Sequence, residues 1–193
     1  MATVLTFPDP RGSYLQATRY IDFDSDEVRG LVEALRAQAG REPEAFARAA
    51  FEHVRDRIAH SADVRGRRVT RTASDVARHG EGICHAKSHL LVALLRAAGI
   101  PAGVCYQRLT LNDGPEDGHV IHALVACELR GRWIRLDARF SIDEEHLAFT
   151  IRPEMGEIDY RICFADAHPL TAAALEAHDD ALVMCATGLP DAL

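Results

Sequence analysis

The sequence predicts an α+β fold in which N-terminal helices and a central buried helix pack on an antiparallel sheet. Three observations predict it. Apolar residues recur at helical spacing through the first half of the chain. From Val104 onward their period changes to two, which is typical of strands. Between these halves, the segment 84–98 is apolar almost all round after its first turn, as expected of a helix that is covered on every side.

The length, composition and charge of the chain restrict its class. Because 48% of its 193 residues are hydrophobic, we expect one globular domain over residues 1–193. The net charge of −7 has the wrong sign for nucleic acid or an anionic membrane, so neither is expected as a partner. The N-terminus lacks the basic and apolar regions of an export signal, which predicts a cytoplasmic protein. Five cysteines, an odd count without a CxxC pair, predict reduced thiols.

The elements before the central helix follow from capping residues and helix breakers. Ser25 and Gly40 bound the first helical pattern, and Pro43 begins the second. Thr72 and Asp75 have the spacing of a capping box, which predicts a short helix. The expected elements are an irregular lead-in with at most one strand (1–23), helices over 25–40 and 43–60, a basic solvated loop to which we assign no function (61–72, including Arg65–Arg71) and the short helix from Thr72.

Two glycines precede the cysteine with which the central helix is expected to begin. Gly80 and Gly82 interrupt the chain just before Cys84, and Gly99 ends the helix. The unpaired N–H groups and the positive end of a helix favour a thiolate at Cys84, and the same N–H groups can hold an oxyanion. We therefore expect Cys84 to be a nucleophile. The other cysteines are expected to be small core residues: Cys105, Cys127, Cys163 and Cys185.

After the central helix, a hairpin is the most informative feature. Strands are expected over 104–111, 120–129 and 132–138, followed by a helix over 169–177. A two-residue turn at Arg130 and Gly131 would place Leu124 opposite Asp137 and His122 opposite Arg139.

This register gives the hairpin a core face and a polar face. The core face carries Ala123, Val125, Cys127, Leu129, Ile134, Leu136 and Ala138. The other face carries His122, Trp133, Arg135 and Asp137 and is expected to be the polar one. His122 and Asp137 are diagonal neighbours there, at roughly 7 Å between backbones, so that imidazole and carboxylate can meet. With Cys84 they form a candidate catalytic triad.

Alternatives remain open around this triad. The second oxyanion donor could be Gln107 or His60. A metal site is the competing interpretation of the cysteine, because His85 and His89 are one helical turn apart, although no HExxH motif is present. The members of that site would be Cys84, His85, His89 and either His119 or His122. No dinucleotide fingerprint or phosphate loop is found, and no cofactor is expected.

Several motifs resemble the transglutaminase-like superfamily, whose core is similar to that of papain-type thiol enzymes. They are the GxC at a helix start, LLRAAGIPA, a His-Ala pair in a strand, and Trp133 four residues before Asp137. The resemblance spans about residues 43–140, and the segment LAFTIRPEMGEIDY is similar to small bacterial members. It implies that Cys84 is the nucleophile, His122 the general base and acid, and Asp137 the residue that orients His122. No calcium site carries over, and Ala138–Ser141 depart from the expected Ala-Arg-Gly-Asn.

We therefore expect a thiol enzyme that forms an acyl-enzyme thioester at an amide or related carbonyl, with no bound cofactor. Hydrolysis would make it a peptidase or amidase, and transfer to an amine would make it a transglutaminase. Its expected partner is a peptide, protein or small amide substrate, and its oligomeric state is left open. The non-enzymatic alternative is a catalytically silent interaction domain.

Overall fold

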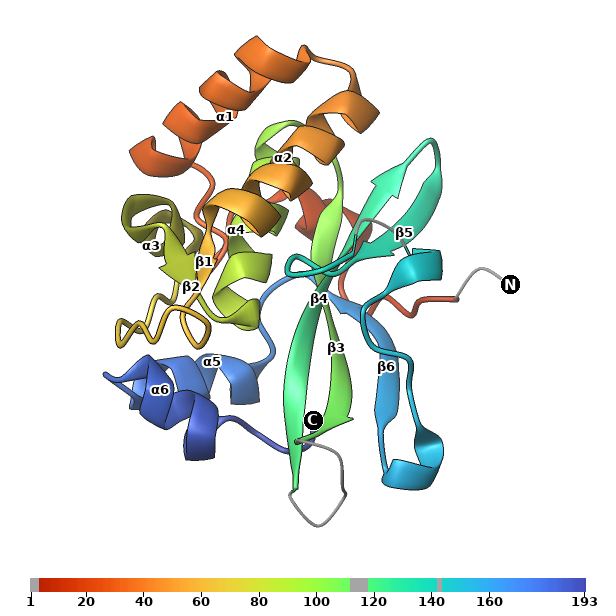
Figure 1. The fold of residues 1–193 in the computed structure, drawn as a ribbon. Helices are drawn as coiled ribbons and strands as arrows, with labels where there is room; N and C mark the ends of the chain where they lie inside the picture. The colour runs from red at the N-terminus through yellow and green to blue at the C-terminus, as the bar shows by residue number, and fades with distance from the viewer. Residues whose placement is uncertain (1–3, 112–117, 142–143) are drawn as a thin grey trace.

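An antiparallel sheet with helices packed against it forms the framework of the protein in this computed structural model (Figure 1). The structure describes residues 4–111, 118–141 and 144–193, so residues 1–3 of the expected lead-in lie outside it. The strand order is β5-β4-β3-β6. These strands are β3 (Ala102–Thr110), β4 (His119–Leu129), β5 (Arg132–Leu136) and β6 (Ile158–Phe164). The predicted α+β class is confirmed.

The helices before the sheet begin at the predicted caps. They are α1 (Asp26–Ala39), α2 (Pro43–Arg57), α3 (Ala73–His79) and α4 (Cys84–Ala97). The Ser25 side chain accepts a hydrogen bond from the N–H of Val28, and Thr72 and Asp75 form the predicted capping box. The second helix ends at Arg57, earlier than expected, because the next residues leave it for the short strand β1 (Ala59–His60).

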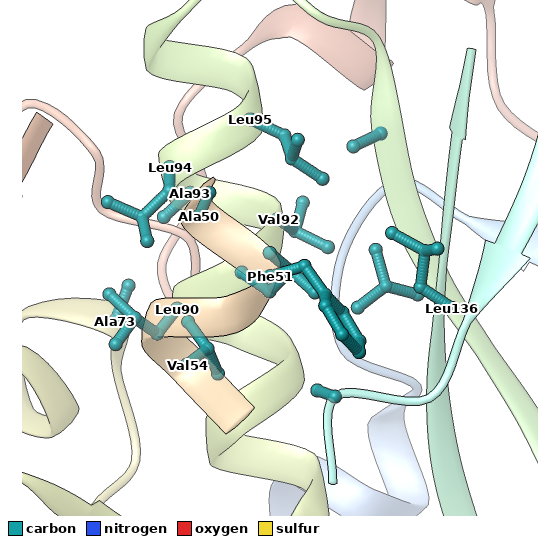
Figure 2. Packing of buried hydrophobic residues seen from close by; sticks show 14 of the residues in the cluster. Ala50, Phe51, Val54, Ala73, Leu90, Val92, Ala93, Leu94, Leu95 and Leu136 are labelled. Carbon is teal, nitrogen blue, oxygen red and sulfur yellow. The ribbon is translucent and has the colours of Figure 1, made fainter. Parts of the chain in front are cut away.

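Helix α4 lies at the centre of the main hydrophobic core, as predicted. Its side chains Leu90, Leu91, Val92, Leu94 and Leu95 are fully buried. Figure 2 shows Leu90, Val92, Leu94 and Leu95 among side chains of neighbouring elements, with Phe51 of α2 directed toward Leu136 of β5. This burial fixes the position of the first turn of α4, where the candidate nucleophile lies.

The only lysine of the chain, Lys87, is buried inside α4. Its Nζ donates to the carbonyl oxygen of Ile58 at 2.6 Å and to that of Arg55 at 3.4 Å. These carbonyls belong to the C-terminal end of α2, where a positive charge is favourable. Burial lowers the pKa of Lys87 to about 8. Lys87 thus joins the start of α4 to the end of α2.

Arg96 is the second buried cation of α4. Its guanidinium donates to the carbonyl oxygen of Gln16 at 2.7 Å, to that of Ala102 at 2.8 Å and to that of Ala165 at 2.5 Å. Burial lowers its pKa to about 10. Arg96 therefore holds the N-terminal segment, the start of β3 and the segment after β6 together.

The predicted register of the β4–β5 hairpin is confirmed over its paired length. Leu129 pairs with Arg132, Ala126 with Arg135, and the ladder ends where Val125 pairs with Leu136. Beyond that point the chain leaves the sheet, because Asp137 and Ser141 bond each other's backbones in a tight turn. The expected pairs of Leu124 and His122 are therefore not part of the ladder.

The hairpin face that carries His122 is buried, and the expectation of a polar, exposed face is wrong. A second hydrophobic cluster covers it, built from Tyr14, Cys105, Leu124, Ala126, Cys163 and Ala165 with Trp133 packed against it. Tyr14 comes from the 3-10 helix η1 (Arg11–Leu15), part of the expected irregular lead-in. On β5, Arg135 is buried and pairs with Asp159 of β6 at 2.6 Å. Residues from both ends of the chain thus cover this face.

The C-terminal part adds elements that the sequence did not reveal. Helix α5 (Pro169–Ala177) lies as predicted, but β6, the short helix α6 (Ala181–Val183) and the π-helix η5 (Met184–Gly188) were not predicted. The carbonyl oxygen of Pro190 accepts a hydrogen bond from the N–H of Ile121 at 3.0 Å, so the end of the chain lies along β4. Among the described residues between β5 and β6, 3-10 turns lie at Glu144–His146 and Pro153–Met155. Among the described residues, none of the helices combines the length and apolarity needed to cross a membrane.

Candidate active site

A short parallel strand pair sets the approach to Cys84. Strand β1 (Ala59–His60) pairs with β2 (Glu81–Gly82), with His60 opposite Gly82. The N–H of Ser61 donates to the carbonyl oxygen of Gly82 at 3.2 Å. Helix α4 begins directly after this pair, and its N-cap residue Ile83 gives no side-chain hydrogen bond. The N–H groups of the first turn therefore remain available to a ligand at Cys84.

The two glycines before Cys84 have different structural reasons. Gly80 ends α3 in the left-handed conformation, with φ of 67°. Gly82 has no room for a side chain, since a Cβ there would lie 2.8 Å from Thr70 Oγ1 and 3.1 Å from Ala86 Cβ. From the sequence we expected the glycines to allow the close approach of backbone or substrate. At Gly82 the groups that approach closely are the side chains of Thr70 and Ala86.

The structure brings His122 and Asp137 into contact. His122 Nε2 and Asp137 Oδ2 are 3.0 Å apart, and both side chains are buried. The second carboxylate oxygen of Asp137 accepts from the N–H of Arg139 at 2.9 Å. The turn after β5 thus holds the carboxylate, and the carboxylate holds the imidazole. Because Nε2 is engaged, Nδ1 is the nitrogen of His122 left for the thiol.

Three imidazoles lie near the thiol of Cys84. His85 Nδ1 lies 3.5 Å from Cys84 Sγ, and His60 and His122 line the same cleft as Cys84. Burial alone raises the pKa of Cys84, but the charge of His85 and the hydrogen bonds from His122, His60 and His85 outweigh it. The net result is a pKa well below the usual value of a thiol.

The pKa of His122 moves in the opposite direction. Burial lowers it, but the hydrogen bonds to Asp137 and Cys84 raise it to about 10. The two shifts act in the same sense, because both favour a Cys84 thiolate beside a protonated His122. Such an ion pair would activate a cysteine nucleophile.

Of the two candidates for a second oxyanion donor, His60 lies at the thiol. It lines the cleft that contains Cys84 and His122, and its buried Nδ1 has no hydrogen-bond partner. Gln107 lies opposite His122 on β3 but lines a different cavity, beside Arg135 and Asp159.

Two residues of the alternative metal site, His89 and His119, are engaged elsewhere. His89 Nδ1 lies 2.9 Å from the carbonyl oxygen of Arg71, and burial lowers the pKa of His89 to about 4. His119 Nε2 lies 2.9 Å from the carbonyl oxygen of Met155. In residues 4–111, 118–141 and 144–193, no group of three or more histidine, cysteine or acidic side chains could hold a metal ion.

The expected burial of the other cysteines holds for all but one. Cys105, Cys127 and Cys163 are buried, whereas Cys185 is half-buried and lines the same cleft as Cys84. Burial and the nearby charge of Cys84 raise the pKa of Cys185 to about 11. The expectation of a core residue is therefore wrong for Cys185, because η5 places it at the cleft. No sequence pattern pointed to this π-helix.

Comparisons with known proteins concern the family and the fold of the chain. A profile of the transglutaminase-like superfamily matches residues 30–138. A proposed cysteine protease from Cytophaga hutchinsonii superposes with a TM-score of 0.51 at 20% identity, over 68% of this chain and 43% of that chain. The periplasmic domain of TgpA from Pseudomonas aeruginosa gives a TM-score of 0.46 at 23% identity, over 67% of this chain and 47% of its own.

The likeness to these solved structures covers a part of each of them. The matched part spans less than half of either solved chain, and at these identities the first likeness concerns the fold alone. A search of curated proteins finds no significant match.

Proposed function

This chain belongs to the transglutaminase-like superfamily, and from that premise we propose that it is a thiol enzyme that forms an acyl-enzyme thioester on Cys84. The proposed substrate is an amide or related acyl carbonyl in a peptide, a protein or a small molecule. The observation that carries the proposal is the 3.0 Å contact between His122 Nε2 and Asp137 Oδ2, which directs the other imidazole nitrogen to a thiol at a helix start.

In the proposed first step, the Cys84 thiolate attacks the carbonyl carbon of the amide. The N–H groups at the start of α4, with His60, stabilise the negative charge on the carbonyl oxygen. Protonated His122 then gives its proton to the nitrogen as the carbon–nitrogen bond breaks. The products are a free amine and a thioester on Cys84.

In the second step, neutral His122 takes a proton from the attacking water or amine. The thioester bond breaks and Cys84 leaves as a thiolate. Water releases a carboxylic acid, which is the reaction of a peptidase or amidase, and an amine forms a new amide, which is that of a transglutaminase. We propose hydrolysis as the main outcome, because water reaches a half-exposed cysteine without a binding site, whereas an amine acceptor needs one.

The test determines whether the acyl group is transferred to water or to an amine. The protein is incubated with glutamine-containing and general peptides, with and without a dansylated primary amine, and products are identified by mass spectrometry. Hydrolysed products that persist with amine present support hydrolysis, and amine adducts that dominate at low millimolar amine make the protein a transferase.

Cysteine variants supply the controls for this test. Cys84→Ala should lose the thioester and both activities, whereas Cys185→Ala should still form the thioester, since the pKa of the Cys185 thiol is raised to about 11. If wild type and Cys84→Ala are equally inert on peptide, amide and ester panels, the chain is a silent interaction domain instead.

A further inference from the structure

The cleft beside Cys84 has walls that the proposed chemistry does not use. It is a cavity of about 420 Å³, within the size range of ligand sites. Leu109 and Leu111 come from the end of β3 and the residue after it, and Val120 from the start of β4. Leu189 of the C-terminal segment also lines it. These four side chains give the cleft an aliphatic part.

An aromatic side chain lies next to the imidazole. The rings of Phe149 and His122 meet edge to face, with their centroids 5.2 Å apart. Phe149 is 38% exposed, so part of its ring is in contact with water. It would lose contact with water if a ligand occupied the cleft.

The charges in the cleft outside the triad are balanced within the protein. Arg152 Nη2 donates to Glu157 Oε1 at 2.8 Å, and the same carboxylate oxygen accepts from the Thr110 hydroxyl at 2.7 Å. Burial raises the pKa of Glu157, but these hydrogen bonds outweigh it and lower the pKa to about 2, so Glu157 stays ionised opposite its arginine. Arg139, the other arginine of the cleft, pairs with Asp63.

A charged substrate group in this cleft would lose its hydration and find Arg139 and Arg152 already in ion pairs, although Arg139 Nε has no hydrogen-bond partner. That loss costs several kcal/mol unless a partner replaces the water. An apolar group would instead gain by covering the aliphatic part of the cleft and Phe149. Transfer from water to the cleft is therefore unfavourable for a charged group and favourable for an apolar group.

We propose that the cleft binds an uncharged, apolar side chain on the acyl side of the bond that Cys84 attacks, and that it discriminates against carboxylate and ammonium side chains there. The inference rests on the proposed role of Cys84 as nucleophile. It adds to that role the chemical class of the acyl group.

Affinity labels of Cys84 test the proposal without knowledge of the natural substrate. N-acetyl-aminoacyl chloromethyl ketones with leucine, glutamine, glutamate and lysine side chains place each group on the acyl side of the reacting carbon. The second-order rate of Cys84 labelling is measured by intact and peptide mass spectrometry and divided by the rate with iodoacetamide. The leucine reagent should exceed the glutamate and lysine reagents by at least about tenfold, the scale of selectivity that a hydrophobic pocket provides.

Two variants change the cleft in defined ways. Val120→Thr keeps the shape but adds a hydroxyl to the wall, and it should reduce the preference for leucine, whereas Val64→Thr, exposed and outside the cleft lining, should not. Asp63→Asn removes the partner of Arg139, so it should raise the rate of the glutamate reagent relative to leucine. The Asp63 side chain is 55% exposed, and its replacement should leave the fold intact.

The outcomes separate this inference from the proposed function. If Cys84 reacts readily but the glutamate or lysine reagent matches the leucine reagent, the apolar acyl site is wrong and the nucleophile stands. The same holds if Asp63→Asn leaves the ratio of glutamate to leucine rates unchanged. If no reagent, iodoacetamide included, labels Cys84 in preference to other thiols, the proposed function fails and this inference fails with it.

Discussion

At the scale of single residues, one cleft contains two half-buried cysteines whose pKa values shift in opposite directions. The imidazoles around Cys84 lower the pKa of its thiol, and burial raises that of Cys185 to about 11. Because the thiolate is the reactive form, the pair offers an internal comparison of environment at similar access.

We predict that substoichiometric iodoacetamide at pH 7 labels Cys84 before any other cysteine of the native protein. Peptide mass spectrometry locates the label, and Cys185 serves as the comparison within the same cleft. Equal or faster labelling of Cys185 would show that access, and not ionisation, governs reactivity here.

The pH dependence of this labelling rate should show how the imidazole of His122 affects the ionisation of Cys84. Because the pKa of Cys84 is lowered well below the usual value of a thiol, the wild-type rate should rise less between pH 6 and 9 than that of an ordinary thiol. In His122→Ala a hydrogen bond that lowers the pKa of Cys84 is lost, so the rate should fall at pH 7 and recover as pH rises. Asp137→Asn should have a smaller effect, since Asp137 acts through His122.

His79→Ala is the control for that series, because His79 is exposed on α3. Its pH profile should match the wild type. A His122→Ala profile identical to the wild type would remove His122 from the proposed mechanism. Since His122 and Asp137 are buried, circular dichroism should accompany each variant to separate loss of reactivity from loss of fold.

At the scale of elements, the start of α4 depends on close packing at Gly82. A Cβ there would meet Thr70 Oγ1 and Ala86 Cβ at distances that force a shift. We predict that Gly82→Ala lowers both the melting temperature and the rate of Cys84 alkylation, because the displaced β2 carries the chain into the first turn of α4.

Gly30→Ala is the matched control for this variant. Gly30 lies within α1, and a Cβ added there would have no other atom within 4 Å, so alanine should stabilise the helix by about 0.5–1 kcal/mol. Its alkylation rate should equal that of the wild type. A Gly82→Ala protein as stable and reactive as the wild type would contradict the packing argument.

Lys87 connects two elements and should give stability a distinct pH dependence. Its pKa in the folded protein, about 8, lies below the unfolded value of about 10.4. Between these values the unfolded state binds more protons, so the free energy of unfolding gains from rising pH. We predict that the wild type gains stability relative to Lys87→Met between pH 8 and 10, measured by urea unfolding at pH 7 and pH 9.5.

The sign of this difference is the critical observation. Comparing the two proteins at each pH cancels the titration of groups that they share. A difference that shrinks toward alkaline pH would mean that the charged form of Lys87 is the stabilising one, held by the carbonyl oxygens of Arg55 and Ile58 more strongly than burial opposes it.

At the scale of the whole molecule, the sheet and helices are joined by a core that also positions the site. Leu136 is buried in that core, and Asp137 follows it directly. We predict that Leu136→Ala lowers the free energy of unfolding by about 2–5 kcal/mol, as for other buried leucines. Val183→Ala, at a side chain that is 53% exposed, should change it by less than about 0.5 kcal/mol. Equal effects in urea unfolding would show that the hairpin does not depend on this contact.

Local patterns were sufficient to predict the helix starts and the hairpin register. The capping residues Ser25 and Thr72 and the turn at Arg130 and Gly131 act within a few residues of the chain, and the structure has them as expected. The contact between His122 and Asp137 forms just beyond the end of the β4–β5 ladder.

The covering of the outer sheet face could not be predicted in the same way. The ring centroids of Tyr14 and Trp133 are 5.6 Å apart, although the two residues are distant in the sequence. No sequence pattern near either residue predicts this contact. The alternation of Ile158, Tyr160 and Ile162 is the local signal of β6, but it is short and lies among charged residues. Cys185 reaches the cleft through a π-helix, which has no sequence pattern of its own.

The burial of Lys87 has a consequence for what the protein can do to itself. An acyl group on Cys84 that is passed to an amine would find no lysine on this chain outside the core, since the only one lies buried against α2. Copies of the protein should therefore not become cross-linked to one another through lysine side chains, even when acyl donors are abundant. An acyl group on Cys84 thus lacks a lysine acceptor on a second copy, because the chain has one lysine and that lysine is buried.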